Sequence, residues 1–596
     1  MKLRYVISFY LITIVCINAQ TPEVVSISPS FNEISSDADP TISATFDMPM
    51  DSSSFNQISF SVLGERSGYH SGDINYNSST RTVTFQSKKT YNSGERVTVT
   101  LSNHIRSMQG DSLTGYGWVI RIPAGVAPVY FSEPVEYGGG GEYMQVVDMN
   151  NDNYPDIITS SGVIWINDGY GVFNQYWFIP DCDYFYPLVV DDFNRDGLMD
   201  VLYKGSDDLK IGIGDGKGNF SLTTKPFWFY EYFSTDLNGD GYPDIAGICG
   251  VTYMPPDSTT LNWSIAFNDG AGNFIDTTMY KVGGGGRPEF IIATDLDNDG
   301  DNDIVIASIP EVNPNGIFGL DGIIVGKNNK FGYYNKFDSY QAGVYLDISC
   351  PLWGYVSDFN NDGFNDVAVI GCFAGNVALN SDSGTFGYDE IDNRMFWGAE
   401  LSAPITSADI NGNGWIDILI SGYKWPPERP IPYYTVKINN HSYFSRFDKG
   451  NFNDTLPDAY IEATAVADIN MDNRADIIHC SLYGTYITFN TDSVTDVEEQ
   501  NNPVTSFDIS KNYPNPFNSS TSFEIQVTEP QIISISIFNV LGKEVRELEN
   551  KRFVTGEYKV NWDGKDDNQN YLPSGVYLIM VQAGKQIQYL KSILLK

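Results

Sequence analysis

The chain has 596 residues and a formal net charge of −39 at pH 7, from 75 acidic and 36 basic residues. This length exceeds what one hydrophobic core supports, so several domains are expected. The acidic excess repels phosphate and argues against a nucleic-acid partner. A hydrophobic content of 42%, with 55 glycines, 38 tyrosines and 35 phenylalanines, is typical of a folded chain rich in strands and turns.

The first 19 residues have the pattern of a secretory signal peptide. Lys2 and Arg4 precede an apolar run from Val6 to Ile17, and Asn18-Ala19-Gln20 follow. Such a run is short for a membrane span, which needs about 20 apolar residues, and typical of a signal sequence. We therefore predict cleavage after Ala19, a secreted or cell-surface protein, and no transmembrane segment.

Residues 22–124 contain short runs in which apolar and polar residues alternate, the pattern of half-buried strands in a β-sandwich. The clearest runs are Thr41–Phe46, Arg81–Phe85 and Arg96–Leu101. The segments Ile27–Pro29, Phe46–Asp51 and Ile105–Leu113, together with Trp118, resemble the bacterial Ig-like domain of many surface proteins. That resemblance implies a spacer or structural module.

Seven nine-residue segments between residues 128 and 490 fit one pattern, D-x-[DN]-x-[DN]-[GN]-x-x-D. Oxygen side chains at positions 1, 3, 5 and 9 can converge on one hard cation, and Ca²⁺, which takes six to eight oxygen ligands, fits best. The pattern predicts about seven Ca²⁺ sites. The candidate ligands are Asp148, Asn150, Asp152 and Asp156; Asp192, Asn194, Asp196 and Asp200; Asp236, Asn238, Asp240 and Asp244; Asp295, Asp297, Asp299 and Asp303; Asp358, Asn360, Asp362 and Asp366; Asp409, Asn411, Asn413 and Asp417; and Asp468, Asn470, Asp472 and Asp476.

The same loops have a simpler interpretation as polar Asx turns without metal. Seven copies in register, with Gly or Asn at position 6 where a positive φ is expected, favour the metal site. An EF-hand does not fit, because each loop is followed by strand-forming residues and position 12 lacks the required Glu. The sixth loop has Asn413 at position 5, so it has two carboxylates and should bind Ca²⁺ most weakly.

The loops recur at intervals of 44 to 63 residues, a length that suits a four-stranded propeller blade with insertions. A second motif follows each loop and predicts a hairpin whose Phe packs between blades; it is clearest in Asn167–Phe173, Gly214–Phe220 and Asn268–Phe274. Weaker copies end at Phe331, Phe386 and Phe444.

The last repeat stops at Asn490 without its final strand. We therefore predict that the segment Val129–Phe131, which precedes the first loop, supplies that strand and closes the ring.

In these repeats, residues 128–490 resemble the FG-GAP/VCBS-type β-propeller, the calcium-loop fold also seen in integrin alpha subunits. The resemblance implies that the calcium loops lie on one rim and that the ligand surface is usually on the opposite face. The predicted fold class is all-β, a seven-bladed β-propeller flanked by two Ig-like β-sandwich domains.

Residues 491–505 have no apolar period and are expected to form an acidic linker. In residues 506–596, strands are predicted at Ser522–Val527, Ile533–Phe538, Glu557–Trp562 and Val576–Gln582. The motifs Asn512–Asn518, Val540–Val545, Val560–Gly564 and Leu572–Tyr577 resemble the C-terminal sorting domain of type IX secretion. The resemblance implies export by that machinery to the outer surface of a Gram-negative cell, and the alternative is an ordinary Ig-like domain.

The four histidines show no zinc-ligand or catalytic-triad spacing, so a non-catalytic protein is expected. Five cysteines remain after signal cleavage, and their odd number and wide spacing define no disulfide pairing. The segments between blades are rich in aromatic residues, which form either a platform for a glycan or protein ligand, or packing between blades. They are Tyr143, Tyr184, Tyr186, Trp228, Tyr230, Trp353, Tyr355, Phe396 and Trp397. Two functions stay open, an adhesion or binding protein and a calcium-dependent enzyme acting on polysaccharides.

Overall fold

The computed structural model describes most of residues 21–595, which divide into two compact units, residues 1–494 and 495–596. Nearly all regular structure in the described residues is β-strand, and their one helix is the short 3-10 turn η1 (Ser52–Ser54). No helix among them has the length and apolar character needed to cross a membrane. The structure does not describe residues 1–20, 127–128, 181, 183–186, 206–207, 226–228, 255–257, 284–286, 310–321, 342–352, 371–374, 382–383, 393–404, 425–430, 440–443, 452–460, 483, 492–506, 511, 529, 540–542, 584–585 and 596.

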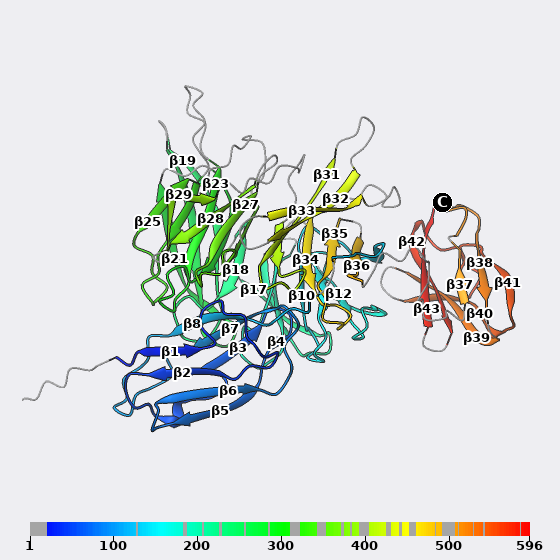
Figure 1. Ribbon diagram of the computed structural model, residues 1–596. Coiled ribbons are helices and arrows are strands. Elements are labelled where there is room, and N and C mark those ends of the chain that lie inside the picture. The colour runs from blue at the N-terminus through cyan, green and yellow to red at the C-terminus, as the bar shows by residue number, and fades with distance from the viewer. Residues whose placement is uncertain are drawn as a thin grey trace, which may run out of the picture. The chain divides into compact units, whose positions relative to one another are not determined.

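The N-terminal domain is a sandwich of two four-stranded antiparallel sheets (Figure 1, blue). Its core contains Phe46, Phe60, Phe85 and Trp118, each at most 2% exposed, between the two sheets. The alternating runs predicted from the sequence therefore place their apolar residues inward. One sheet is ordered β1 (Val24–Ser28), β2 (Ile42–Phe46), β6 (Thr82–Ser87) and β5 (Gly72–Asn77); the other is ordered β4 (Gly68–Tyr69), β3 (Phe60–Gly64), β7 (Arg96–Leu101) and β8 (Tyr116–Arg121).

The repeat region forms seven antiparallel sheets of four strands, and each metal-loop candidate joins the first and second strands of one sheet. The first three sheets are β10 (Met144–Val147), β11 (Asp156–Thr159), β12 (Val163–Ile166) and β13 (Gln175–Phe178); β14 (Leu188–Asp191), β15 (Asp200–Lys204), β16 (Leu209–Gly214) and β17 (Phe220–Lys225); and β18 (Tyr232–Thr235), β19 (Asp244–Met254), β20 (Ser258–Asn268) and β21 (Phe274–Gly283). The next three are β22 (Arg287–Thr294), β23 (Asp303–Ile309), β24 (Gly322–Gly326) and β25 (Phe337–Gln341); β26 (Trp353–Ser357), β27 (Asp366–Ile370), β28 (Gly375–Ser381) and β29 (Thr385–Asp392); and β30 (Ile405–Ala408), β31 (Asp417–Lys424), β32 (Ile431–Asn439) and β33 (Phe444–Asn451).

The seventh sheet draws its strands from both ends of the repeat region. It is ordered β34 (Ala463–Ala467), β35 (Asp476–Cys480), β36 (Gly484–Thr488) and β9 (Val135–Gly138). The first strand of each sheet contacts the first strand of the next, and β34 returns to contact β10. The seven sheets therefore follow one another in a closed cycle.

The strand that completes the seventh sheet comes from the expected part of the chain but lies further along it than predicted. Val135 to Gly138 pair with Ile487 to Gly484, whereas the predicted segment Val129–Phe131 makes one bridge, from Phe131 to Asn490. Four residues beyond that bridge, Val135 enters the regular ladder. The longer stretch gives four paired residues in place of one, which is why it forms the strand.

We expect Tyr137 to stabilise the pairing of this closing strand by packing against the first sheet. Its half-buried ring lies 5.3 Å from the ring of Phe173 and 5.8 Å from that of Trp165, both in the first sheet. Tyr137→Ala should lower the free energy of unfolding by about 2–4 kcal/mol, because it removes aromatic packing between the last sheet and the first. Calorimetry checks this against Tyr170→Ala, whose side chain is 79% exposed, and equal small shifts in both variants would contradict it.

The second repeat motif forms the predicted hairpin turns, as in the bonds from Asp168 N to Val172 O and from Asp269 N to Asn273 O. Phe173 is 4% exposed in a core cluster that joins the first and seventh sheets, as predicted. The prediction for Phe331 is wrong, because this side chain is 53% exposed. The motif begins at Asn328, so its seventh residue is Tyr334, which is 3% exposed in a cluster shared by the third and fourth sheets.

The C-terminal unit is a second sandwich, with a three-stranded and a four-stranded sheet around a core that includes Phe523, Ile535 and Trp562. The four predicted strands lie within β38, β39, β41 and β42, while β37, β40 and β43 were not predicted. The sheets are β37 (Phe507–Ile509), β38 (Thr521–Val527) and β41 (Gly556–Trp562); and β40 (Glu544–Phe553), β39 (Gln531–Asn539), β42 (Gly575–Ala583) and β43 (Gln586–Leu594).

Candidate metal loops

All seven loops share one backbone conformation. The carboxylate at position 1 accepts a hydrogen bond from the backbone N–H of position 6 in every loop, at 2.7–2.9 Å. The side chain at position 5 accepts one from the N–H of position 7 in every loop, at 2.8–3.2 Å. The positive φ expected at position 6 is confirmed, with values from 66° to 94°.

Position 4 also has a positive φ, between 56° and 76°, in all seven loops, which sequence reasoning missed. Five of these residues are not glycine, and they include Arg195 and Met471, for which the left-handed conformation is uncommon. With two left-handed residues, each loop brings the N–H groups of positions 6 and 7 to the side chains of positions 1 and 5.

The aspartate at position 9 connects each loop to the following strands of its own sheet by hydrogen bonds. Its Oδ1 atom accepts a hydrogen bond, at 2.7–2.9 Å, from the N–H of the residue that begins the second motif of the same sheet. In six loops its Oδ2 atom accepts from the N–H of position 2, at 2.9–3.1 Å. These aspartates are at most 2% exposed. Each one is therefore a structural clamp, a buried side chain that holds the loop by accepting backbone hydrogen bonds, as well as a candidate ligand.

The asparagine that begins the second motif connects neighbouring loops. In five sheets its Nδ2 donates to the carbonyl of position 8 in its own loop and to the carbonyl of position 2 in the preceding loop, at 2.6–3.2 Å. Asn167 of the first sheet reaches Ile469 of the seventh loop, so one of these bridges joins the first repeat to the last. The sequence shows that this asparagine recurs before the hairpin turns. No pattern in the neighbouring residues indicates that its side-chain amide bonds to two loops.

The fourth loop holds the densest oxygen cluster. Carboxylate oxygens of Asp295, Asp297 and Asp299 lie within 4.8 Å of one another, and this is the only such group of three acidic, histidine or cysteine residues in the described part of the chain. Asp303, the fourth predicted ligand, is not in that group; its Oδ2 atom is buried without a hydrogen-bond partner. Lys327 Nζ lies 2.6 Å from Asp297 Oδ2 and partly offsets the charge.

Burial makes these carboxylates hard to ionise in the absence of a cation. It raises the pKa of Asp192 to about 6, of Asp236 to about 7 and of Asp200 to about 8. In the fourth loop, burial and then the neighbouring carboxylates raise the pKa of Asp295 and Asp303 to about 8. A divalent cation held by these oxygens would reverse that effect, because it stabilises the ionised form.

The donor set fits a calcium ion, since it consists of carboxylate, amide and carbonyl oxygens with no sulfur or imidazole. The partnerless Oδ2 of Asp303 provides an orphaned oxygen at the densest cluster. In the sixth loop, Asn413 Oδ1 accepts the same hydrogen bond that Asp makes elsewhere, from Trp415 N. That loop therefore keeps its conformation with one negative charge fewer.

The N-terminal domain packs against the loops. Direct hydrogen bonds join Asp148 N to Arg66 O, Asn103 N to Gly239 O and Gly117 N to Gly300 O, each at 2.7 Å. The other four loops are contacted as well. Tyr69 shares a core cluster with Met199 of the second loop, and Asn32 donates to the carbonyl of Gly363 in the fifth. Gly125 lies against Gly412 of the sixth loop, and Ser93 donates to the carbonyl of Asn473 in the seventh. The sequence implied a spacer or structural module, and in the structure this part of the chain contacts all seven loops.

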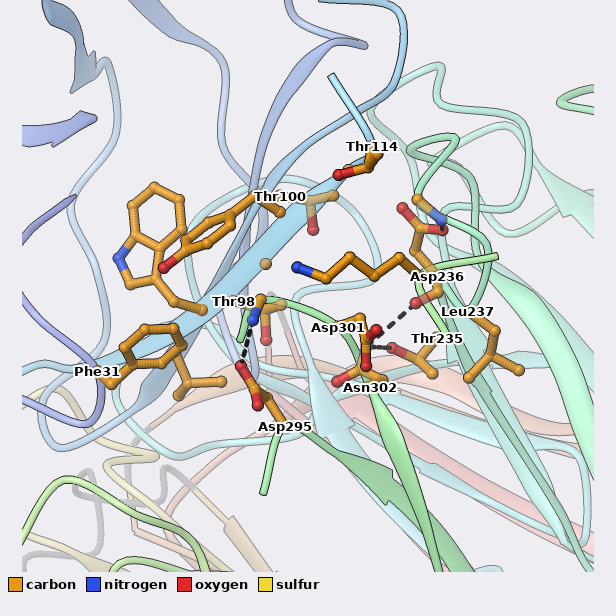
Figure 2. A pocket seen from close by; sticks show the side chains of 18 of the residues that line it. Phe31, Thr98, Thr100, Thr114, Thr235, Asp236, Leu237, Asp295, Asp301 and Asn302 are labelled. Atoms are coloured by element: carbon orange, nitrogen blue, oxygen red, sulfur yellow. Dashed lines mark hydrogen bonds between the residues drawn. The ribbon is translucent and has the colours of Figure 1, made fainter. Parts of the chain in front are cut away.

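Two cations of this domain reach candidate ligands. Lys89 Nζ lies 3.4 Å from Asp148 Oδ2, and Arg121 donates to Asn361 Oδ1 at 2.7 Å with its guanidinium 3.9 Å from Asp358. A small cavity of about 50 Å³ lies between the domain and the third and fourth loops. Figure 2 shows Thr98 of the domain beside Asp295 in this space, with Thr114 at the other end.

The other residues singled out in the sequence include buried, half-buried, exposed and undescribed positions. His70 and His479 are fully buried, and burial lowers the pKa of each to about 3. Cys249 and Cys480 carry free thiols. Of the aromatic residues, Tyr230 is 51% exposed and Tyr143 is half-buried. Outside the described residues lie Tyr184, Tyr186, Trp228, Phe396, Trp397, His441, Cys350 and Cys372, and the side chain of Phe444 is also not described.

Three segments match protein-family models. Residues 18–119 match the bacterial Ig-like domain, residues 236–306 the FG-GAP-like repeat, and residues 511–586 the FlgD Ig-like domain. These matches confirm an Ig-like domain near each end and FG-GAP-like repeats between them. No curated protein matches the chain.

Solved structures resemble the chain only weakly. A lectin of Agrocybe aegerita that recognises non-reducing terminal N-acetylglucosamine has 17% identity over 62% of this chain and 90% of its own, with a TM-score of 0.37. PorZ, a surface component of the type IX secretion system of Porphyromonas gingivalis, has 10% identity over 85% and 69%, with a TM-score of 0.32. The rhamnogalacturonan lyase YesX has 10% identity over 78% and 92%, also with 0.32. At TM-scores below 0.5, these similarities support no inference about the function of this chain.

Proposed function

We propose that this chain is an extracellular calcium-binding protein that binds a glycan or protein ligand without catalysing a reaction. Its seven sheets would be the blades of a β-propeller, and its 28 loop residues would hold about seven Ca²⁺ ions. The observation that carries this proposal is the single hydrogen-bond pattern repeated in seven loops, each of which gathers buried oxygens whose charge needs a cation.

The proposed location is the outer surface of a Gram-negative cell. The signal-like N-terminus supports export, and the resemblance of residues 506–596 to a type IX sorting domain supports recognition by that machinery. The Ig-like sandwich of residues 511–586 is compatible with such a domain. Fusing residues 491–596 to a carrier protein and following its secretion tests this part separately.

A binding role is supported by the state of two of the three described histidines, His70 and His479, while the third, His104, is exposed. His70 donates to or accepts from Ser67 and Ser87 inside the first sandwich, and His479 is fully buried. With the pKa of each lowered to about 3, neither can exchange protons near neutral pH. Most carboxylates in the loops are likewise engaged by backbone N–H groups.

A glycan array and a cell-adhesion assay, each run with the signal-free chain in millimolar Ca²⁺ and in EGTA, test the proposed function. We expect saturable binding that requires Ca²⁺, because the metal orders the loops that support the sheets. Incubation with acidic polysaccharides should release no new reducing or unsaturated ends. Release of such products, abolished by EGTA, would contradict the non-catalytic role.

A further inference from the structure

A second cavity, of about 580 Å³, lies between the N-terminal domain and the first strands of the sheets. Its walls come from β10, β14, β18, β26, β30 and β34. Its other boundary comes from the turn between β3 and β4 and from β7 of the N-terminal domain. This volume is within the range of small-molecule sites in proteins.

Arg66, in the turn between β3 and β4, is the most unusual residue of this cavity. It is 7% exposed, and within the described residues its guanidinium has no hydrogen bond or ion pair. Its backbone is fixed, because Arg66 N donates to Glu95 Oε2 and Arg66 O accepts from Asp148 N. Its nitrogens are not among the buried polar atoms without a partner, so they open onto the cavity, where an anion can accept hydrogen bonds from them.

Arg96 lines the same cavity and donates to the carbonyl of Val356 at 3.1 Å. Both arginines interact electrostatically with Tyr355, so they lie near one another in the cavity. Two such groups suit a carboxylate, because the planar guanidinium donates two parallel hydrogen bonds to it.

Elsewhere the cavity offers groups that suit hydroxyls. Tyr143 donates to Glu231 Oε1 at 2.8 Å, and Ser234 donates to Asp191 Oδ2 at 2.7 Å. Phenolic, hydroxyl and carboxylate oxygens of this kind bind sugar hydroxyls, while the rings of Tyr143, Tyr232, Phe233 and Tyr355 provide apolar surface.

The acids of the cavity limit the charge that a ligand can carry. Glu65, Asp191 and Glu231 line it together with the two arginines, so a second carboxylate placed inside the cavity would be repelled. A ligand with one carboxylate and several hydroxyl groups satisfies both sets of side chains.

We propose that this cavity binds a hexuronate, a sugar with a single carboxylate, and that Arg66 and Arg96 hold the carboxylate. This inference rests on the proposed ligand-binding function and specifies the class of ligand. The uronate is either a free monosaccharide or the end residue of an acidic glycan.

Isothermal titration of the calcium-loaded, signal-free chain tests the inference, with D-galacturonate, D-glucuronate, trigalacturonate, D-galactose and D-glucose as probes. We expect at least one acidic sugar to bind tenfold or more tightly than its neutral counterpart. Tighter binding of trigalacturonate than of the monosaccharides would identify a glycan end, and equal binding a free sugar.

Arg66→Gln should weaken uronate binding at least tenfold and leave the melting temperature nearly unchanged, because the fold uses only the backbone of Arg66. The matched control is Arg106→Gln, an exposed arginine of the same domain that donates to Ser112 Oγ. Absence of binding by all three acidic probes, or equal affinity in the Arg66 variant, would overturn the inference. Array binding to neutral glycans alone would reject this ligand class and leave the proposed function standing.

Discussion

Removing calcium with EGTA should lower the melting temperature of the signal-free chain by about 10 °C. Extracellular calcium sites commonly bind in the range of about 10⁻⁴–10⁻³ M. At a free Ca²⁺ concentration ten times Kd, each site adds about 1.4 kcal/mol, so seven independent sites add about 10 kcal/mol. For a folded unit of nearly five hundred residues, that free energy corresponds to a shift of this size.

The same experiment has a defined pH dependence. Aspartates in an unfolded chain have a pKa of about 4, whereas burial raises the pKa of Asp192 to about 6 and of Asp295 to about 8. The folded, metal-free loops therefore bind protons that the unfolded chain releases. Their contribution to stability is complete below pH 4 and is lost as the pH rises through 6 to 8.

Calorimetry in EGTA at pH 5 and pH 8 checks the sign, with excess Ca²⁺ at each pH for comparison. The metal-free chain should melt at a lower temperature at pH 8, and Ca²⁺ should raise the melting temperature more at pH 8 than at pH 5. A melting temperature that responds to neither Ca²⁺ nor pH would show that the loops are polar turns without metal.

Asp244→Ala should destabilise the chain by about 3–5 kcal/mol, both with Ca²⁺ and in EGTA. Asp244 is fully buried and accepts hydrogen bonds from Leu237 N at 3.0 Å and Asn268 N at 2.9 Å. The substitution leaves two backbone donors without partners inside the protein, in addition to removing a ligand.

Asp240→Asn separates the ligand role from the structural one. The amide oxygen of Asn can accept from Tyr242 N as the carboxylate does, and Asn413 does so at the equivalent position of the sixth loop. This variant should therefore lose stability in Ca²⁺ but be at least as stable as the wild type in EGTA, because burial raises the pKa of Asp240 and the Asn amide carries no charge. Asp215→Ala, in an exposed turn, serves as the surface control, and a comparable loss there would contradict the clamp role of Asp244.

The sequence alone determined the features that depend on short spacing along the chain. Seven copies of one nine-residue pattern predicted seven equivalent loops, and the Gly or Asn at position 6 predicted the positive φ that all seven have. Alternating apolar residues located strands in both sandwiches. Such features arise from backbone conformation and side-chain period within a few residues, so they can be read locally.

The tertiary structure decided what depends on residues far apart in the chain. The closing strand is Val135–Gly138 rather than Val129–Phe131, because both segments have strand-like residues and only the partner β36 selects between them. The amide of Asn167 in the first repeat donates to Ile469 of the seventh loop, 302 positions further along the chain. The packing of the N-terminal domain on the loops, and the cavity that leaves Arg66 without a partner, come from surfaces whose fit no local pattern in the sequence encodes.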